Sequence, residues 1–294
     1  MATTRTGSFP IGFRRGWGQW QRDLPTLLRF ARDNDFPFLD FGPAPVEELR
    51  QALATGLAIG SVDLMRWSDL VSPDADKRAD AVRANTEYVR QVASLGVKHF
   101  LAVMSPEDPT LERRSNFGLA ADAYRRLCGA VAPLGVKIVL EGWPGKPPHF
   151  AALACTPADL RAMFDAVGSE VLGVNFDPSH LVRMGIDPVP FVREFATRIF
   201  HAHAKDTAWL DEDRYDHGTL QQATFAEPRA FGGHHWRYTL PGHGACPWKE
   251  ILAALHERGY RGLLSIELED GQFNGSTTGE QRGLVGARAF LAGT

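Results

Sequence analysis

This sequence has few cysteines, no long apolar run and no block of charge of one sign. Its three cysteines, Cys128, Cys155 and Cys246, include no Cys-x-x-Cys pair, so neither a disulfide framework nor a cysteine zinc site is expected. No stretch approaches the roughly 20 apolar residues of a membrane-spanning helix, and the start of the chain lacks the apolar core of a signal peptide. We therefore expect a cytoplasmic protein with no membrane partner.

Basic and acidic residues nearly balance, with 32 Lys and Arg against 35 Asp and Glu, which leaves a formal net charge of −3. A nucleic-acid partner is therefore not expected. No Gly-x-Gly-x-x-Gly or Walker loop follows an expected strand, so no nucleotide cofactor is indicated. With 44% hydrophobic residues among 294, the chain is typical of a globular protein with a large core.

Short apolar or β-branched runs alternate with segments of helical spacing almost from end to end, which is typical of a parallel sheet. The runs that predict strands are residues 9–13, 36–41, 57–64, 99–104, 137–141, 172–177, 199–205 and 263–269. The segments that predict helices are 24–33, 46–55, 77–95, 117–132, 157–167, 188–195, 248–258 and 280–291. Eight strands are the number of a (β/α)8 barrel. The expected α/β fold is therefore a single TIM barrel domain over residues 1–294.

The connection after the seventh expected strand, residues 207–247, breaks the pattern of short loops. Loops of this length in a compact domain are usually functional or disordered. This one is rich in aromatic and histidine side chains, including Trp209, Trp236 and His243, which disfavours disorder. We expect an ordered insertion, either a lid over the mouth of the barrel or a contact in a homo-oligomer, with His243 as a candidate substrate contact.

Polar residues of the last four strands point into the barrel, because a strand alternates its two faces with a period of two. His201 lies one layer deeper than His203 and is expected to hydrogen-bond to Asn175 or Ser265. Each strand ends with a carboxylate or imidazole at the C-terminal end of the barrel, where active sites of this fold lie. The expected inward set is Val139, Glu141, Asn175, Asp177, His201, His203, Lys205, Ser265, Glu267 and Glu269.

Glu141, Asp177, His203 and Glu267 are the expected ligands of one divalent metal ion. Burying unpaired charges costs several kcal/mol each, so three converging carboxylates require a cation. Three oxygens and one nitrogen suit Mn²⁺, with Mg²⁺ or Co²⁺ as alternatives, better than Zn²⁺. The competing interpretation is four unrelated polar strand ends, each solvated or paired with a neighbour, and the joint pattern disfavours it.

These segments resemble the metal-site strands of the sugar phosphate isomerase/epimerase family, the xylose isomerase-like barrels that include the ketose 3-epimerases. The resemblance implies the same four ligands, and it assigns to His180 a contact with a substrate oxygen. It does not extend to Trp209, which stands where the ketose epimerases carry a substrate arginine, so free ketohexose as the substrate does not carry over. The segments that carry the resemblance are Val139-Leu-Glu141, Asn175-Phe-Asp-Pro-Ser-His180, His201-Ala-His-Ala-Lys-Asp206 and Leu264-Ser-Ile-Glu267.

Glu141 and Glu267 come from strands that are not neighbours, so they can flank a substrate across the mouth as an acid/base pair. A divalent ion on a carbonyl and its adjacent hydroxyl stabilises the enediolate that follows removal of the α-proton. Lys205 is expected either to hold a substrate oxygen or to pair with Asp206 or Glu269. Trp143 is a candidate wall for a sugar face.

The leading hypothesis is a metal-dependent isomerase or epimerase of a keto-sugar or sugar derivative. The alternative is a lyase in which the same enolate expels a β-substituent, such as an inosose-type dehydratase or an enzyme that cleaves a 3-keto-glycoside. A DNA endonuclease of the same barrel type would need a basic face, which the net charge of −3 disfavours. A binding module without catalysis would not require two facing carboxylates across a metal.

Overall fold

Eight strands close into a barrel in the computed structural model of the chain, which describes residues 2–146, 150–221 and 223–294. They pair in the order β1, β10, β7, β6, β5, β4, β3, β2, and each of these pairs is parallel. The predicted TIM barrel is therefore confirmed, and each predicted strand overlaps an observed one. The barrel strands are β1 (Ile11–Arg14), β2 (Phe38–Phe41), β3 (Ala58–Asp63), β4 (His99–Ala102), β5 (Lys137–Glu141), β6 (Leu172–Phe176), β7 (Ile199–Ala204) and β10 (Leu264–Ile266).

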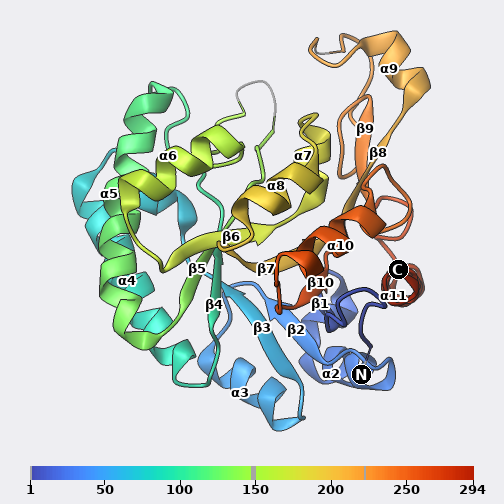
Figure 1. The fold of residues 1–294 in the computed structure, drawn as a ribbon, viewed down its shortest axis with the longest axis horizontal. Helices are drawn as coiled ribbons and strands as arrows, with labels where there is room; N and C mark the ends of the chain where they lie inside the picture. Colours follow the sequence, from blue (N-terminus) through green and yellow to red (C-terminus); the bar gives the residue numbers. More distant parts are fainter. Residues whose placement is uncertain (1, 147–149, 222) are drawn as a thin grey trace.

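Helices surround this barrel (Figure 1), as the alternating pattern predicts. The predicted bounds of α2, α6 and α8 agree with the observed ones. The pattern does not predict α7, because its 6 residues make fewer than two turns and show no periodicity. The helices are α1 (Gln19–Arg22), α2 (Leu24–Asp33), α3 (Val46–Ala54), α4 (Ala75–Ala93), α5 (Arg113–Val131), α6 (Pro157–Val167), α7 (Pro178–Arg183), α8 (Pro188–Phe195), α9 (Asp211–His217), α10 (Trp248–Glu257) and α11 (Thr277–Gly293), with short 3₁₀ turns at Trp67–Val71 and Ala132–Leu134.

Apolar side chains fill the barrel near the N-terminal ends of its strands. Phe38 is buried there, and a Cβ atom at Gly12 or at Gly60 would approach its ring to 2.7 Å. The two glycines therefore leave the space that the ring occupies. Val139, expected to point inward, is also buried. This apolar filling leaves the polar strand ends to meet at the opposite, C-terminal end.

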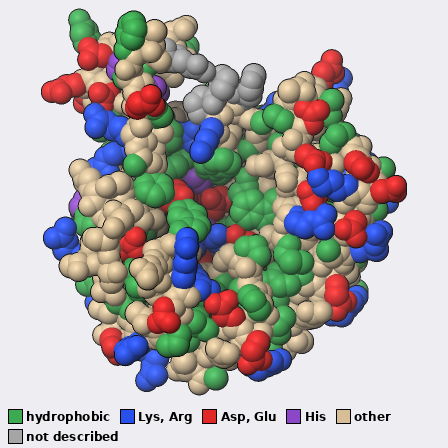
Figure 2. Space-filling view, turned by 180° about the vertical axis from the view of Figure 1, so that it is seen from behind, with side chains coloured by type: hydrophobic (Ala, Val, Ile, Leu, Met, Phe, Trp, Pro, Cys, Tyr) green, Lys and Arg blue, Asp and Glu red, His purple; other side chains and the backbone are tan. Residues whose placement is uncertain are grey.

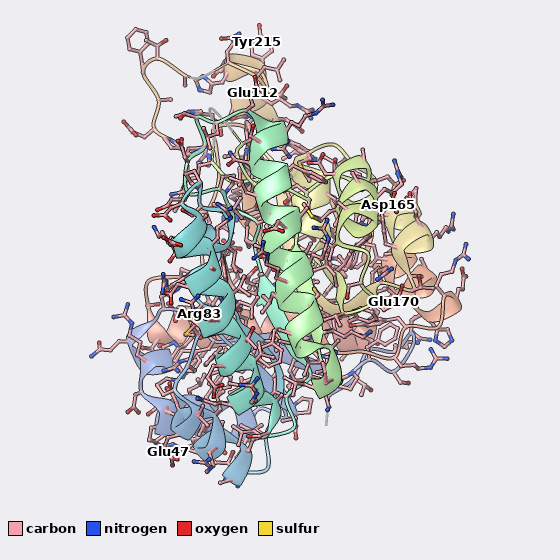
Figure 3. The ribbon with its side chains drawn as sticks, turned by 90° about the vertical axis from the view of Figure 1, so that its left-hand side faces the viewer. Glu47, Arg83, Glu112, Asp165, Glu170 and Tyr215 are labelled. Carbon is pink, nitrogen blue, oxygen red and sulfur yellow. The ribbon has the colours of Figure 1, made fainter. Side chains whose placement is uncertain are left out.

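The insertion predicted at residues 207–247 contains ordered structure. Strands β8 (Asp206–Trp209) and β9 (Trp236–Thr239) pair antiparallel, and helix α9 lies between them in the sequence. We call residues 206–239 the arm. It extends away from the barrel in Figure 1, and Figure 3 shows Tyr215 at the outer end of the molecule. Whether the arm acts as a lid or as an oligomer contact stays a prediction.

In the ranges that the structure describes, no helix combines the length and the apolar character that crossing a bilayer requires.

Candidate metal centre

Four side chains from four barrel strands converge at the C-terminal end of the barrel. Glu141 ends β5, Asp177 follows β6, His203 lies in β7 and Glu267 follows β10. Each of these residues offers one potential ligand atom, and the four atoms lie within 4.8 Å of one another. The four residues therefore form a candidate metal site. In Figure 2 acidic and histidine side chains lie deep in a hollow that hydrophobic side chains surround. The structure therefore brings the four predicted ligands together.

The polar atoms of this cluster fit a cation. Asp177 accepts the backbone N–H of Ser179 at 2.9 Å through Oδ1, whereas its Oδ2 is buried without a hydrogen bond among the described residues. Nδ1 of His203, also without a hydrogen bond there, lies 2.8 Å from Glu141 Oε2 and 3.5 Å from Glu267 Oε2. Orphaned buried polar atoms are rare in native proteins, and an ion is one of their explanations. A divalent ion among these oxygens and this nitrogen would satisfy them.

Neutral and basic donors hold the carboxylate of Glu141. Asn175 donates through Nδ2 to Oε2 at 2.8 Å, and His180 Nε2 contacts Oε1 at 3.0 Å. Burial alone would raise the pKa of Glu141, but His203 and His180 lower it well below its ordinary value. The structure thus places His180, which the resemblance assigns to a substrate oxygen, directly on one of the proposed metal ligands.

A residue of the arm completes the surroundings of His180. Tyr238 of β9 is buried, and its hydroxyl lies 2.7 Å from His180 Nδ1. Arg183 at the end of α7 donates to the same hydroxyl at 3.0 Å. Because Arg183 can only donate, the tyrosine O–H is free to donate to Nδ1, which leaves Nε2–H of His180 to donate to Glu141. The base of the arm is therefore part of the site, and the sequence pattern contains no signal for Tyr238.

Two cations hold the carboxylate of Glu267. Lys205 Nζ donates to Glu267 Oε2 at 2.5 Å and to Glu269 Oε2 at 3.0 Å. Arg14 Nε lies 3.2 Å from Glu267 Oε1, while its two terminal nitrogens donate to both oxygens of Asp63 at 2.8 and 2.6 Å. Burial alone would raise the pKa of Glu267, but the Lys205 ammonium lowers it far below its ordinary value. Glu267 is therefore held as a carboxylate.

One expectation about hydrogen-bond partners agrees with the structure, and one is wrong. Lys205 pairs with Glu269 as one alternative predicted, but Asp206 instead accepts the backbone N–H of Cys246 at 2.8 Å. His201 does not bond to Asn175 or Ser265. Its Nε2 lies 2.7 Å from the carboxylate of Asp40, which projects from β2 across the barrel. The error for His201 concerns which of several inward polar groups comes within contact distance, which strand parity does not encode.

The two remaining candidates, Trp143 and His243, have different surroundings. Trp143 is half-buried and packs against the small cluster of Val103, Ala152 and Cys155, just after Glu141. His243 is exposed, packs edge-to-face on Phe273 at 5.8 Å, and lines a separate cavity of about 300 Å³ beside α11. The hydrogen bonds and ion pairs among the described residues include none between His243 and the four ligands.

Arg14, Asp40 and Asp63 are functional candidates that the sequence analysis missed. Each lies near the C-terminal end of one of the first three barrel strands and is buried or nearly so. Their signal is the same inward parity that identified the ligands in the last four strands. Parity alone does not select all three, because Arg14 lies outside the expected run 9–13 and residues 36–41 carry apolar side chains on both parities.

Comparison with known proteins agrees with this architecture. The chain is 33% identical over 158 residues to YfiH, an uncharacterised protein of Bacillus subtilis, with 52% of this chain and 46% of that protein covered. It is 27% identical over 151 residues to an inosose dehydratase of Lacticaseibacillus casei, with 51% and 46% covered. The chain thus spans about half the length of the first curated relatives that it matches.

A solved structure shares the whole fold. The 3-keto-D-glucoside 4-epimerase YcjR of E. coli superposes with a TM-score of 0.72 over 96% of this chain and 99% of that one, at 13% identity. The model of one protein family, described as a xylose isomerase-like TIM barrel, matches residues 27–291. The chain therefore belongs to the xylose isomerase-like TIM barrel family.

Proposed function

We propose that this protein is a divalent-metal-dependent enzyme that isomerises or epimerises a keto-sugar or sugar derivative. The observation that carries the proposal is the convergence of Glu141, Asp177, His203 and Glu267, whose ligand atoms lie within 4.8 Å of one another in a buried cluster. The name of one structural relative supports it, since YcjR is an epimerase of a 3-keto-D-glucoside.

The metal we propose is Mn²⁺, with Mg²⁺ or Co²⁺ as alternatives, because three carboxylates and one imidazole form a hard ligand set. When bound, such an ion supplies Lewis acidity to a substrate carbonyl and its adjacent hydroxyl. We assign no further step to the ion.

Glu141 and Glu267 are the proposed acid/base pair. They belong to β5 and to the end of β10, which β6 and β7 separate in the barrel. One carboxylate removes the proton from the carbon next to the carbonyl, and the other returns a proton to the opposite face. Their surroundings differ, because Glu141 is held by histidines and an amide whereas Glu267 is held by two cations.

The proposed substrate contacts are His180, Lys205 and Trp143. His180 and Lys205 each contact one member of the acid/base pair, so a substrate between the two carboxylates lies within their reach. Trp143 lies two residues after Glu141 and is partly exposed, which suits a wall for a sugar face. His243 lines the separate cavity beside α11, and the proposal gives it no role.

A lyase is the second candidate. In this case one carboxylate removes the same proton, the electron pair expels a hydroxyl or an alkoxy group from the β-carbon, and the second carboxyl group donates the proton with which it leaves as water or an alcohol. Two observations favour it: the curated relative named inosose dehydratase, and Trp209, which stacks on His235 with ring centroids 5.9 Å apart where the ketose epimerases have an arginine.

Proton nuclear magnetic resonance in D₂O tests both candidates. Mn²⁺-loaded enzyme is incubated with keto-sugars, inososes and 3-keto-glycosides, the metal is removed with a chelator, and the products are analysed. Deuterium at an inverted carbon is the expected result for the epimerase, and release of water or an alcohol is the expected result for the lyase. Failure of every substrate to exchange its α-proton would contradict both.

A further inference from the structure

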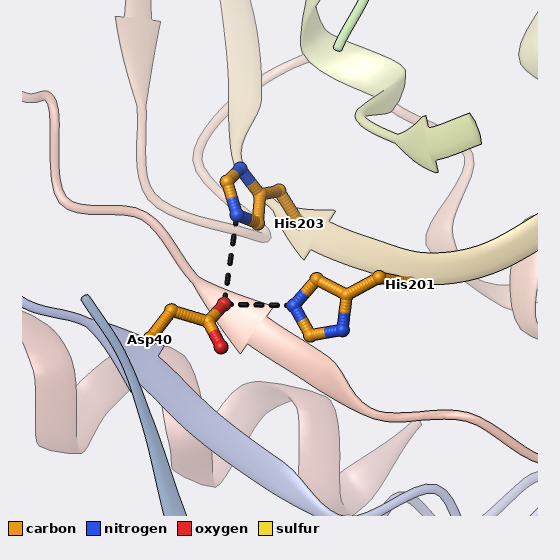
Figure 4. A group of neighbouring side chains, drawn as sticks. All are labelled: Asp40, His201 and His203. Atoms are coloured by element: carbon orange, nitrogen blue, oxygen red, sulfur yellow. Dashed lines mark hydrogen bonds and ion pairs between the residues drawn. The ribbon is translucent and has the colours of Figure 1, made fainter. Parts of the chain in front are cut away.

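A second polar cluster lies directly beneath the candidate metal centre. Asp40 of β2 and His201 and His203 of β7 are all fully buried (Figure 4). The same oxygen, Asp40 Oδ2, lies 2.7 Å from His201 Nε2 and 3.6 Å from His203 Nε2. Burying a carboxylate this deep in a barrel costs free energy, so the contacts that Asp40 makes require an explanation.

His203 stands between the two clusters. Its Nδ1 faces the carboxylates of Glu141 and Glu267, and its Nε2 faces Asp40. A neutral imidazole carries a proton on one nitrogen and a lone pair on the other, so only one of the two nitrogens can ligate a metal. At 3.6 Å, Asp40 Oδ2 lies beyond hydrogen-bond distance of Nε2, which has no hydrogen bond among the described residues. The negative charge of Asp40 nevertheless favours the proton on Nε2, which directs the lone pair of Nδ1 toward the four-residue cluster.

We propose that Asp40 is a positioning residue that keeps the proton of His203 on Nε2 and so presents Nδ1 to the divalent metal. This inference rests on the metal site of the proposed function. His201 has a supporting role, because its contact with Asp40 Oδ2 anchors the carboxylate that His203 faces. Asp40 itself touches neither substrate nor metal in this arrangement.

The surroundings of Asp40 are shaped for this contact. A Cβ atom at Gly60 would approach Asp40 Oδ1 to 2.4 Å, so only a glycine at this position leaves the carboxylate where it is. His201 stacks on His99 with ring centroids 5.7 Å apart, and His99 Nδ1 contacts the carbonyl of Gly60 at 3.1 Å. His99 thus holds both the ring of His201 and the backbone of Gly60, which lies beside Asp40.

A metal ion bound directly by Asp40, His201 and His203 is the competing assignment, since these three residues also group within 4.8 Å. The direct contact between Asp40 Oδ2 and His201 Nε2 favours the positioning role, because these two atoms already satisfy each other at 2.7 Å. Metal stoichiometry separates the two: the positioning role requires one ion per chain, and the competing assignment requires a second.

Metal titration of wild type, Asp40→Asn and Glu280→Gln tests the inference. Glu280 is the matched control, because its buried carboxylate accepts hydrogen bonds from Trp20 and Gln21 and contacts none of the proposed ligands. Calorimetry with Mn²⁺ and the visible absorption of bound Co²⁺ should show one ion per wild-type chain. Affinity should fall by about 10- to 100-fold in Asp40→Asn, with an altered Co²⁺ spectrum, and should stay at the wild-type value in Glu280→Gln.

Equal metal affinity and equal Co²⁺ spectra of wild type and Asp40→Asn would overturn the inference and leave the proposed metal site standing. Two ions per wild-type chain would overturn it as well, since Asp40 would then be a ligand. If wild type bound no divalent ion, the proposed function would fail, and this inference with it.

A second measurement needs no variant and therefore does not depend on the folding of Asp40→Asn. Wild-type protein with ¹⁵N-labelled histidine is titrated with diamagnetic Zn²⁺ and followed by long-range ¹H–¹⁵N correlation. The one ring that shifts on metal addition should carry its proton on Nε2 and the metal on Nδ1. The opposite arrangement, with the metal on Nε2, would contradict the role of Asp40.

Discussion

At the scale of single residues, the two proposed acid/base carboxylates are held by different neighbours. Glu141 is contacted by Asn175 and His180, whereas Glu267 is contacted by Lys205 and Arg14. Groups whose environments differ in this way can take different roles in one proton-transfer cycle. Substituting each carboxylate by its amide keeps the shape and removes the charge, so it separates catalytic from structural contributions.

Glu267→Gln should weaken metal binding and lower the rate of α-proton exchange by about 10²- to 10⁴-fold, the usual contribution of a positioned acid or base. Exchange of the substrate proton in D₂O and Mn²⁺ titration measure the two effects. Glu269→Gln is the matched control, since Glu269 also contacts Lys205 but belongs to no candidate ligand set. Full activity of metal-loaded Glu267→Gln would rule out the acid/base role.

Tyr238→Phe should lower the rate by roughly fivefold, because the hydroxyl that orients His180 toward Glu141 is lost and one buried hydrogen bond is worth about 1 kcal/mol. Steady-state kinetics measures the rate, and urea unfolding measures the free energy of unfolding. Tyr260→Phe removes a comparable hydrogen bond, from the hydroxyl to the carbonyl of Leu263, away from the site. An equal loss of rate in both variants would argue that the effect is only structural.

At the scale of elements, each proposed ligand belongs to the end of a strand, and one of them also begins a helix. Asp177 is the N-cap of α7, because its Oδ1 accepts the backbone N–H of Ser179 at 2.9 Å. Its Oδ2 is the orphaned oxygen that faces His180 and Lys205 at 3.4 Å each. The same carboxylate therefore fixes α7 with one oxygen and is proposed to bind the metal with the other.

Asp177→Asn and Asp177→Ala should separate these two tasks. Both variants should lose metal affinity by more than the roughly 100-fold typical of outer-shell changes. Only the alanine variant loses the cap acceptor, so its metal-free form should be about 1 kcal/mol less stable than that of the asparagine variant. Urea unfolding with a chelator present measures the difference. Retention of wild-type metal affinity by Asp177→Asn would remove Asp177 from the ligand set.

At the scale of the whole molecule, all three cysteines are free and buried beneath the shell of helices and loops. Burial raises the pKa of the Cys128 thiol and of the Cys155 thiol to about 12 each, and it also raises the pKa of Cys246. The thiolate is the reactive form, so folding suppresses the chemistry of these residues. This agrees with the absence of any disulfide or cysteine-metal pattern in the sequence.

Ellman's reagent at pH 8 should therefore label the native protein at least about 100-fold more slowly than the protein in guanidinium chloride, because three units of pKa lower the thiolate fraction about 1000-fold. Three equivalents should react after unfolding. Rapid release of one equivalent from the native protein would show that one thiol is accessible, contrary to the structure.

The sequence alone determined the barrel and the convergence of the four proposed ligands, because both follow from local periodicity. The alternation of strands and helices predicts the (β/α)8 order, and a period of two along 137–141, 172–177, 199–205 and 263–269 selects the inward carboxylates and the imidazole. The same rule does not single out Arg14, which lies outside the expected run 9–13, or Asp40, because both parities of residues 36–41 carry apolar side chains.

Only the tertiary structure decided which inward groups touch. Asp40 meets His201 because closure of the barrel brings β2 opposite β7, and Tyr238 reaches His180 because the base of the arm folds back over α7. Partner choice among neighbouring polar groups depends on differences of about an ångström in position, to which hydrogen bonds are sensitive. Periodicity assigns a side chain to a face of a strand, and only the closed barrel determines its partner.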